Sequence, residues 1–159
     1  MFEKLTPRMD KVIRLSQRIA RDYEQDYVGT EHLLLAILEE GTGLGTAILR
    51  ENGVDIARAK AVIDQLVRAS LEDTWVFGRL PGSPHFRNVM ASAIEEARQL
   101  ESKVVCAEHL LIALAREEGS VAHAALAEMG VRAGTVRSAI TRRLEAGEDL
   151  CDSDAKDNR

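Results

Sequence analysis

Apolar residues recur along most of the chain three and four positions apart, which is the spacing of one face of an α-helix. Two stretches with this spacing begin in the same way, with a hydroxyl residue followed by proline: Thr6-Pro7 and Ser83-Pro84. A hydroxyl residue is favoured at the N-cap of a helix and proline at its first position. The pattern therefore predicts one helix from residue 7 to about 23 and another from residue 84 to about 100.

The two stretches are part of a longer internal repeat. The segment VGTEHLLLAILEEG (28–41) corresponds to VCAEHLLIALAREE (105–118), and the same offset of 77 residues aligns Ala20-Arg21 with Ala97-Arg98 and Gly53-Val54 with Gly130-Val131. The alignment needs no gap. Self-similarity at a fixed period indicates a duplicated structural unit.

Each copy predicts four helices. After the first, a second helix begins near Thr30 or Ala107, a third covers about 44–52 or 120–129, and a fourth covers about 55–68 or 132–144. Gly53 and Gly130 have the position of glycines that end a helix in the left-handed conformation. We expect an all-α fold of two four-helix repeats, packed with pseudo-two-fold symmetry. The repeats occupy 1–70 and 83–146, joined by a linker at 71–82 and followed by an acidic, disordered tail at 147–159.

The composition is typical of a helical protein, and the net charge argues against one class of function. Hydrophobic residues make up 45% of the chain but aromatic residues only 4%, so the core must consist of aliphatic side chains. The net charge of −5 is opposite to that of a nucleic-acid-binding surface, which argues against a helical DNA-binding regulator. Two cysteines suit a reducing compartment. We recognise no signal peptide or membrane span, and expect a cytoplasmic protein with neither nucleic-acid nor membrane partners.

The paired EHLL motifs, together with LTPRMDKVIRLSQRIARDY at the start and SPHFRNVMASAIEEARQL in the second copy, resemble the Clp N-terminal domain, or Clp repeat domain, over roughly residues 2–146. In that family the domain stands in front of AAA+ ATPase rings of the ClpA, ClpB and ClpC type. The resemblance implies a non-catalytic module that recruits substrate polypeptides and adaptor proteins to a Clp ATPase or protease complex. This sequence contains no G-x-x-x-x-G-K-[ST] motif for binding ATP, and we expect no cofactor.

Two alternatives remain open within the family. The chain is either the N-terminal domain of a larger unfoldase or a stand-alone accessory protein that docks on the Clp complex without binding tags itself. The polar C-terminal stretch favours the stand-alone protein.

The resemblance also implies ligand-binding residues. In ClpC-type domains the glutamate of the EHLL motif binds the guanidinium of phosphoarginine, a degradation tag. A carboxylate can bind a guanidinium through two hydrogen bonds, and helix N-termini can bind its phosphate. The residues that match are Glu31, Glu108, Thr6, Thr30 and Ser83. Glu31, Thr6 and Glu108 match directly, whereas Ser83 and Ala107 stand where the family more often has threonine, so the first pocket is the better preserved. The simpler interpretation is that each glutamate stabilises the positive end of its helix.

Other chemistries receive less support from the sequence. Cys106 and His109 resemble half of a zinc site, but a zinc site needs three or four ligands and the first copy has Gly29 in place of Cys106. We therefore expect no metal, and expect His32 and His109 to form hydrogen bonds between the two bundles. No catalytic triad is apparent, so an enzyme is the less favoured class. Trp75 and Phe77, in the linker, are expected to fill the groove between the repeats.

Overall fold

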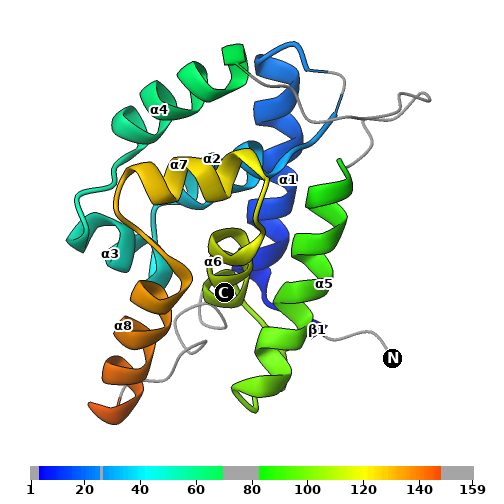
Figure 1. The fold of residues 1–159 in the computed structure, drawn as a ribbon. Helices are drawn as coiled ribbons and strands as arrows, with labels where there is room; N and C mark the ends of the chain where they lie inside the picture. Colours follow the sequence, from blue (N-terminus) through cyan, green and yellow to red (C-terminus); the bar gives the residue numbers. More distant parts are fainter. Residues whose placement is uncertain (1–3, 26, 70–82, 148–159) are drawn as a thin grey trace.

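The structure is a computed structural model that describes residues 4–25, 27–69 and 83–147. Within these ranges the chain forms eight helices and two very short strands (Figure 1). Those of the first unit are β1 Lys4–Leu5, α1 Pro7–Asp22, α2 Thr30–Glu40, α3 Gly43–Glu51 and α4 Ile56–Ala69. Those of the second unit are α5 Pro84–Gln99, β2 Val104–Val105, α6 Ala107–Arg116, α7 Val121–Glu128 and α8 Ala133–Glu145. The predicted all-α class is confirmed, with every predicted helix present.

Local sequence signals account for the ends of these helices. Thr6 is the N-cap of α1, where its hydroxyl oxygen accepts a hydrogen bond from the Met9 N–H over 3.1 Å, and Ser83 does the same for Phe86 over 3.0 Å at the start of α5. Gly53 and Gly130 follow α3 and α7 with φ of 79° and 83°, as predicted. A residue with a β-carbon is strained in this left-handed conformation, so these two glycines let the chain turn directly into the next helix.

The strands β1 and β2 were not predicted. They pair in parallel, with Lys4 opposite Val104 and Leu5 opposite Val105, and so join the first residues of unit one to unit two. Two residues are too few to show the alternation of apolar and polar side chains that identifies a strand in a sequence. The pairing depends instead on the fold, which brings the beginning of α1 beside the beginning of α6.

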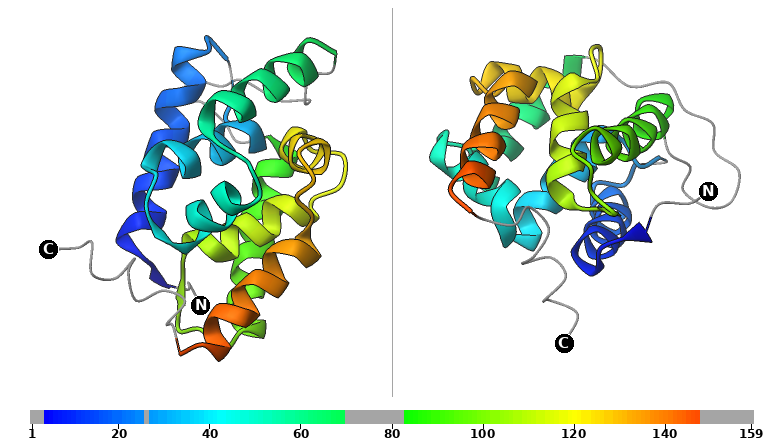
Figure 2. Two further views of the ribbon diagram at one scale, coloured as in Figure 1. Left: turned by 90° about the vertical axis from the view of Figure 1, so that its left-hand side faces the viewer. Right: turned by 90° about the horizontal axis from the view of Figure 1, so that it is seen from below.

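The core runs without interruption through both units. Helices α2 and α6, which contain the EHLL motifs, are its centre, and nine consecutive residues of each are buried, Thr30–Leu38 and Ala107–Ala115. The helices α1 and α5 pack against them, and lie on one flank of the molecule while α3 and α8 lie on the other (Figures 1 and 2). Packing also crosses between the units, since α4 of unit one lies against α7 of unit two and α3 lies against α6. The predicted pseudo-two-fold packing is therefore an interlocked arrangement.

In the described part of the chain, no single helix is both long and apolar enough to cross a membrane. The adjacent helices α2 and α3 reach the necessary length and hydropathy only when taken together, and they are bent by 97° relative to each other. Residues 70–82, which include Trp75 and Phe77, and residues 148–159 of the tail lie outside the described residues. The expectations for the linker and the tail are therefore untested.

Candidate functional site

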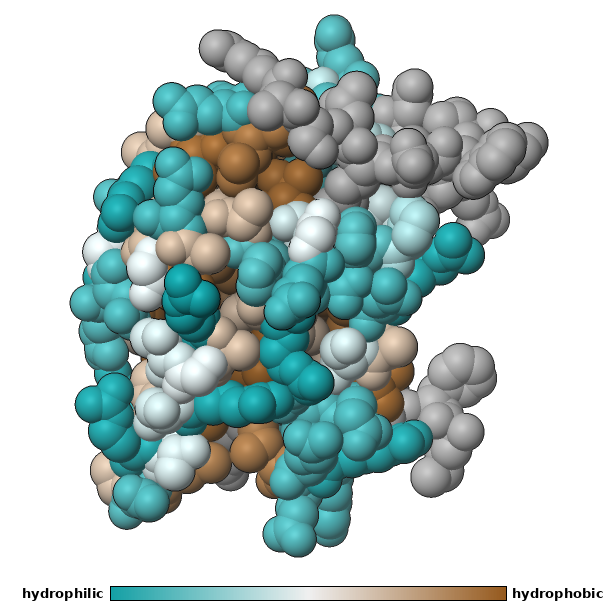
Figure 3. Space-filling view, viewed as in Figure 1, coloured by the Kyte–Doolittle hydropathy of each residue, from teal (hydrophilic) through white to brown (hydrophobic). Residues whose placement is uncertain are grey.

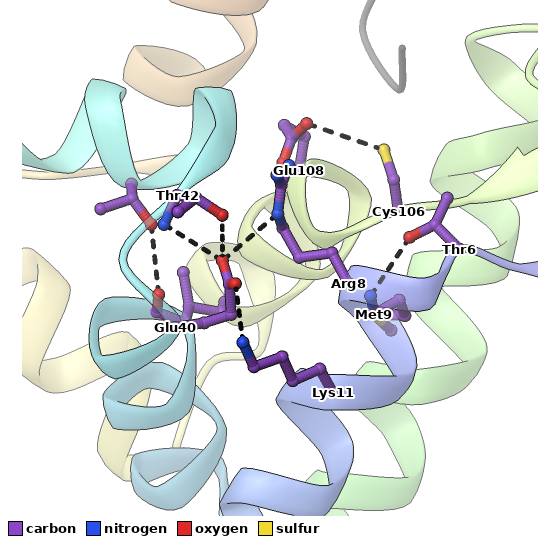
Figure 4. A network of polar contacts seen from close by, with 10 residues as sticks. Thr6, Arg8, Met9, Lys11, Glu40, Thr42, Cys106 and Glu108 are labelled. Carbon is purple, nitrogen blue, oxygen red and sulfur yellow. Dashed lines mark hydrogen bonds and ion pairs between the residues drawn. The ribbon is translucent and has the colours of Figure 1, made fainter. Parts of the chain in front are cut away.

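The helix start of each unit lies beside the EHLL helix of the other unit. The backbone N–H of Thr6 donates to the Val105 carbonyl over 3.1 Å, and the N–H of Ser83 donates to the Val28 carbonyl over 3.0 Å. Val105 and Val28 are the residues that lead into α6 and α2. Thr6 therefore lies near Glu108, as Figure 4 shows, and Ser83 lies at the entrance to the helix that carries Glu31.

This cross-pairing differs from the grouping made from the sequence, which placed Thr6 with Glu31. Helices α1 and α2 are antiparallel, so Thr6 is near the end of α2, where the neighbouring Arg8 Nε lies 3.2 Å from Glu40 Oε1. Glu31 stands nine residues before Glu40, which corresponds to about 14 Å along a helix at roughly 1.5 Å per residue. The sequence could not show this because helix direction depends on the fold and not on the offset between the repeats.

Both glutamates are almost completely buried. Glu31 has 2% of its surface exposed and Glu108 has 0%. The Tyr27 hydroxyl donates to Glu31 Oε2 over 3.0 Å, while the Cys106 sulfur lies 3.9 Å from Glu108 Oε1 (Figure 4). Both carboxylates also lie in the first turn of their helices, where the positive end of the helix dipole favours a negative charge. The simpler interpretation of the glutamates therefore has direct structural support.

The conformation of the Glu31 side chain depends on Gly29, the residue that precedes its helix. The Glu31 side chain folds back over Gly29 so closely that a β-carbon at position 29 would lie 2.0 Å from Glu31 Oε1. Position 106, the equivalent in unit two, carries a cysteine side chain, so Glu108 cannot fold back in the same way. The sequence showed this Gly/Cys difference between the repeats, but its consequence for the carboxylate needed the structure.

Thr30 connects the two units through its side chain. It is fully buried, and its hydroxyl oxygen accepts a hydrogen bond from the Ala122 N–H over 3.1 Å. Ala122 lies in the first turn of α7, where backbone N–H groups have no partner inside the helix. A threonine of unit one thus helps to cap a helix of unit two. The equivalent residue in unit two is Ala107, which has no hydroxyl.

The two histidines of the EHLL motifs have a local role. His32 Nδ1 accepts from the Gly29 N–H over 2.8 Å, and His109 Nδ1 accepts from the Cys106 N–H over 3.0 Å. The expectation that they bond between the bundles was wrong for these contacts, because each ring turns back onto the N-cap residue of its own helix. An accepting Nδ1 requires the neutral tautomer with the proton on Nε2. Burial lowers the pKa of both rings to about 4, so both stay neutral at pH 7.

A polar cluster beside each helix start was missed by the sequence analysis. In unit one, the Glu40 carboxylate pairs with Arg8 over 3.2 Å and with Lys11 over 3.6 Å (Figure 4). In unit two, the equivalent carboxylate is that of Glu117. It contacts His85 Nδ1 over 2.7 Å and accepts from Asn88 over 2.9 Å. The offset of 77 relates Arg8 to His85, Lys11 to Asn88 and Glu40 to Glu117. This correspondence is the feature of the sequence from which the clusters could have been predicted.

Metal coordination has no support in the described part of the chain. Among the described residues, no group of three or more His, Cys, Asp or Glu side chains is placed to hold a metal ion. The Cys106 sulfur does lie 3.4 Å from His109 Nδ1, but that nitrogen is already an acceptor for the backbone.

Comparison with known proteins agrees with the duplicated architecture. The family model described as the Clp repeat (R) N-terminal domain matches twice, at residues 4–74 and 82–156. The chloroplastic chaperone protein ClpC2 of Oryza sativa subsp. japonica is 33% identical over 144 residues, which are 91% of this chain and 16% of that protein. The chloroplastic chaperone protein ClpC1 of Arabidopsis thaliana is 33% identical over 150 residues, 94% of this chain and 16% of that protein. The chain thus spans about a sixth of the length of these relatives.

Solved structures show the same fold. The N-terminal domain of the caseinolytic-protease-associated chaperone ClpD from Arabidopsis thaliana superposes with a TM-score of 0.71, at 22% identity over 89% of this chain and 95% of that one. The N-terminal domain of Hsp104 from Candida albicans also gives a TM-score of 0.71, at 14% identity over 93% and 95% of the two chains. Two matches to one family model, which together cover most of the chain, show that the chain belongs to the Clp repeat (R) N-terminal domain family.

Proposed function

We propose that this chain is a non-catalytic recognition module of a Clp-type unfoldase and protease system, and that it binds substrate polypeptides or adaptor proteins. The observation that carries the proposal is the cross-pairing of helix starts with EHLL glutamates in two equivalent places. The family match supports the same function, since the Clp N-terminal domain is a substrate- and adaptor-interaction module. A Clp-type AAA+ ATPase or protease complex is the partner that this function requires.

We further propose phosphoarginine as a ligand of the two sites. One site consists of Thr6, Arg8 and Glu108, and the other of Ser83, His85 and Glu31. In each, a long helix begins beside the start of the helix that carries the other unit's glutamate, and this arrangement suits an anion next to a guanidinium. The first site carries the fixed positive charge of Arg8 at the position where the second has His85. We therefore expect the Thr6 site to bind the phosphate more tightly.

Calorimetric titration with free phosphoarginine tests this proposal. A charged hydrogen bond contributes roughly 1.5–3 kcal/mol, so Glu108→Gln should weaken the tighter site by about ten- to a hundredfold. The cross-pairing makes a sharper prediction for double variants. Glu31→Gln with Ser83→Ala should impair one site, whereas Glu31→Gln with Thr6→Ala should impair both. Circular dichroism of each variant controls for folding. The proposal fails if the folded wild type and the Glu31→Gln, Glu108→Gln variant bind alike, or if neither binds at millimolar ligand.

The burial of both carboxylates favours a second candidate function. A ligand can reach Glu31 or Glu108 only if side chains around them move, because less than 3% of either residue is exposed. A protein that docks on the Clp complex without binding tags needs no such movement, and its glutamates would serve only to begin their helices. A folded chain that binds a Clp-type ATPase ring but shows no heat with phosphoarginine would support this second function.

A further inference from the structure

A pocket of about 210 Å³ lies in unit one, between the end of α1, the beginning of α2 and the last turns of α4. Its lining residues are Tyr23, Gln25, Glu31, His32, Leu35, Ile63, Asp64 and Val67. Pockets for drug-sized ligands measure roughly 300–1,000 Å³, so this one has room for a single long side chain. Apolar surface is exposed beneath α4, the helix that supplies three of the lining residues (Figure 3).

The lining divides into an apolar and an acidic part. Leu35, Ile63 and Val67 provide aliphatic surface, while Glu31 and Asp64 provide carboxylates. Burial, together with the nearby charge of Asp64, raises the pKa of Tyr23, so this phenol stays protonated and can act as a donor or acceptor. His32 is neutral above pH 6, since burial lowers its pKa to about 4. At neutral pH none of the residues that line the pocket is positively charged.

Part of the polar lining is specific to unit one, although Glu31 has its equivalent in Glu108. The offset of 77 places Leu100 at the position of Tyr23, Ser102 at that of Gln25, and Thr141 at that of Asp64. The apolar positions are kept, because Ile112, Ile140 and Leu144 correspond to Leu35, Ile63 and Val67. Core packing therefore explains Ile112 and Ile140 in unit two, where Leu144 is 38% exposed. It does not explain a second carboxylate and a phenol in unit one alone.

We propose that this pocket binds a basic side chain, lysine or arginine, of a polypeptide segment. The aliphatic stem of such a side chain would lie along Leu35, Ile63 and Val67, and its charged end would reach the exposed Asp64, with the buried carboxylate of Glu31 adding negative charge nearby. Long basic side chains combine these two requirements, since they bury the stem on apolar surface while the charged group keeps polar partners. This inference rests on the proposed function only in taking the ligand to be a polypeptide.

The test uses the whole chain, labelled with ¹⁵N and ¹³C, and three capped tripeptides, acetyl-Gly-X-Gly-amide, with X as arginine, lysine or norleucine. Norleucine keeps the stem and lacks the charge. The arginine and lysine peptides should shift the NMR signals of Tyr23, His32 and Val67, and norleucine should bind about three- to fivefold more weakly, as expected for a partly exposed ion pair. Asp64→Asn should weaken the basic peptides by about three- to fivefold. Glu128→Gln, which removes an exposed carboxylate outside the pocket, should leave their binding unchanged.

Several results would overturn the inference. Equal binding of the norleucine and lysine peptides would show an apolar site, and an unchanged affinity in Asp64→Asn would exclude charge recognition. The absence of shifts at the three lining residues in millimolar peptide would exclude the site. Phosphoarginine is titrated in parallel, so that the two proposals fail separately. Phosphoarginine binding without basic-peptide binding overturns this inference alone, and the reverse overturns the tag proposal alone.

Discussion

Two buried histidines give the stability of this molecule a defined dependence on pH. His32 and His109 are neutral when folded, with pKa values of about 4, but in the unfolded chain their pKa is about 6.5. Below pH 6.5 the unfolded chain therefore takes up protons that the folded chain does not, and stability falls until the pH reaches about 4. The loss amounts to at most roughly 3 kcal/mol for each histidine.

Urea unfolding at pH 7 and pH 5 measures this loss. The control is the His32→Gln, His109→Gln variant, because glutamine at the third helical position can still accept the N-cap hydrogen bond but does not titrate. We expect the variant to lose clearly less stability than the wild type between the two pH values. Equal losses would show that other groups dominate the pH dependence.

At Gly29, the absence of a β-carbon allows the Glu31 side chain to fold back over the backbone. Gly29→Ala would place a β-carbon 2.0 Å from Glu31 Oε1 and 2.7 Å from a ring carbon of Tyr27, so the carboxylate and the phenol must separate. We expect a loss of about 1–3 kcal/mol of unfolding free energy, as for other overpacked sites. Gly134→Ala is the matched control, since nothing lies within 4 Å of a β-carbon there. The prediction is wrong if both variants melt at the wild-type temperature.

At the scale of the elements, the most informative contact is the hydroxyl of Thr30 at the start of α7. Thr30→Val keeps the shape of the side chain but leaves the Ala122 N–H, 3.1 Å away, without this acceptor. Loss of a helix cap costs roughly 0.5–2 kcal/mol, so thermal unfolding should begin at a lower temperature. Hydrogen exchange should also become faster at the start of α7, although the substitution is in α2. Faster exchange confined to α2 would contradict the assigned role.

The elements also show how far the sequence determined the fold. Thr6-Pro7 and Ser83-Pro84 predicted where two helices begin, and Gly53 and Gly130 predicted where two others end. These predictions were possible because a helix cap depends on a few neighbouring residues of the sequence. The cross-pairing of Thr6 with Glu108 could not be predicted, since it depends on a two-residue strand and on the direction of packing. The roles of His32 and His109 were misjudged for a related reason, as a ring can turn back onto its own helix without changing any pattern.

At the scale of the whole molecule, the two units depend on each other. Unit one contributes β1 and Thr30 to contacts with unit two, and α4 packs on α7. Each half has fewer than 75 residues, a size at which a core is marginal. We expect residues 1–70 and 83–147, expressed separately, to lack a cooperative unfolding transition. Calorimetry of each half and of their equimolar mixture tests this prediction. A sharp unfolding transition in each isolated half would refute it.

The parallel strand pair has a further consequence for how such a molecule can arise and be rebuilt. Because the first residues of one repeat complete the other repeat, a polypeptide with a single repeat leaves its own N-terminal segment without a partner. Two identical copies, however, can satisfy each other by exchanging these segments, as in a closed, swapped homodimer. The present chain is then equivalent to such a dimer joined head to tail, in which each half has since been free to change its own residues. His85 in place of Arg8, and Thr141 in place of Asp64, are changes that an identical dimer could not have made in one half alone.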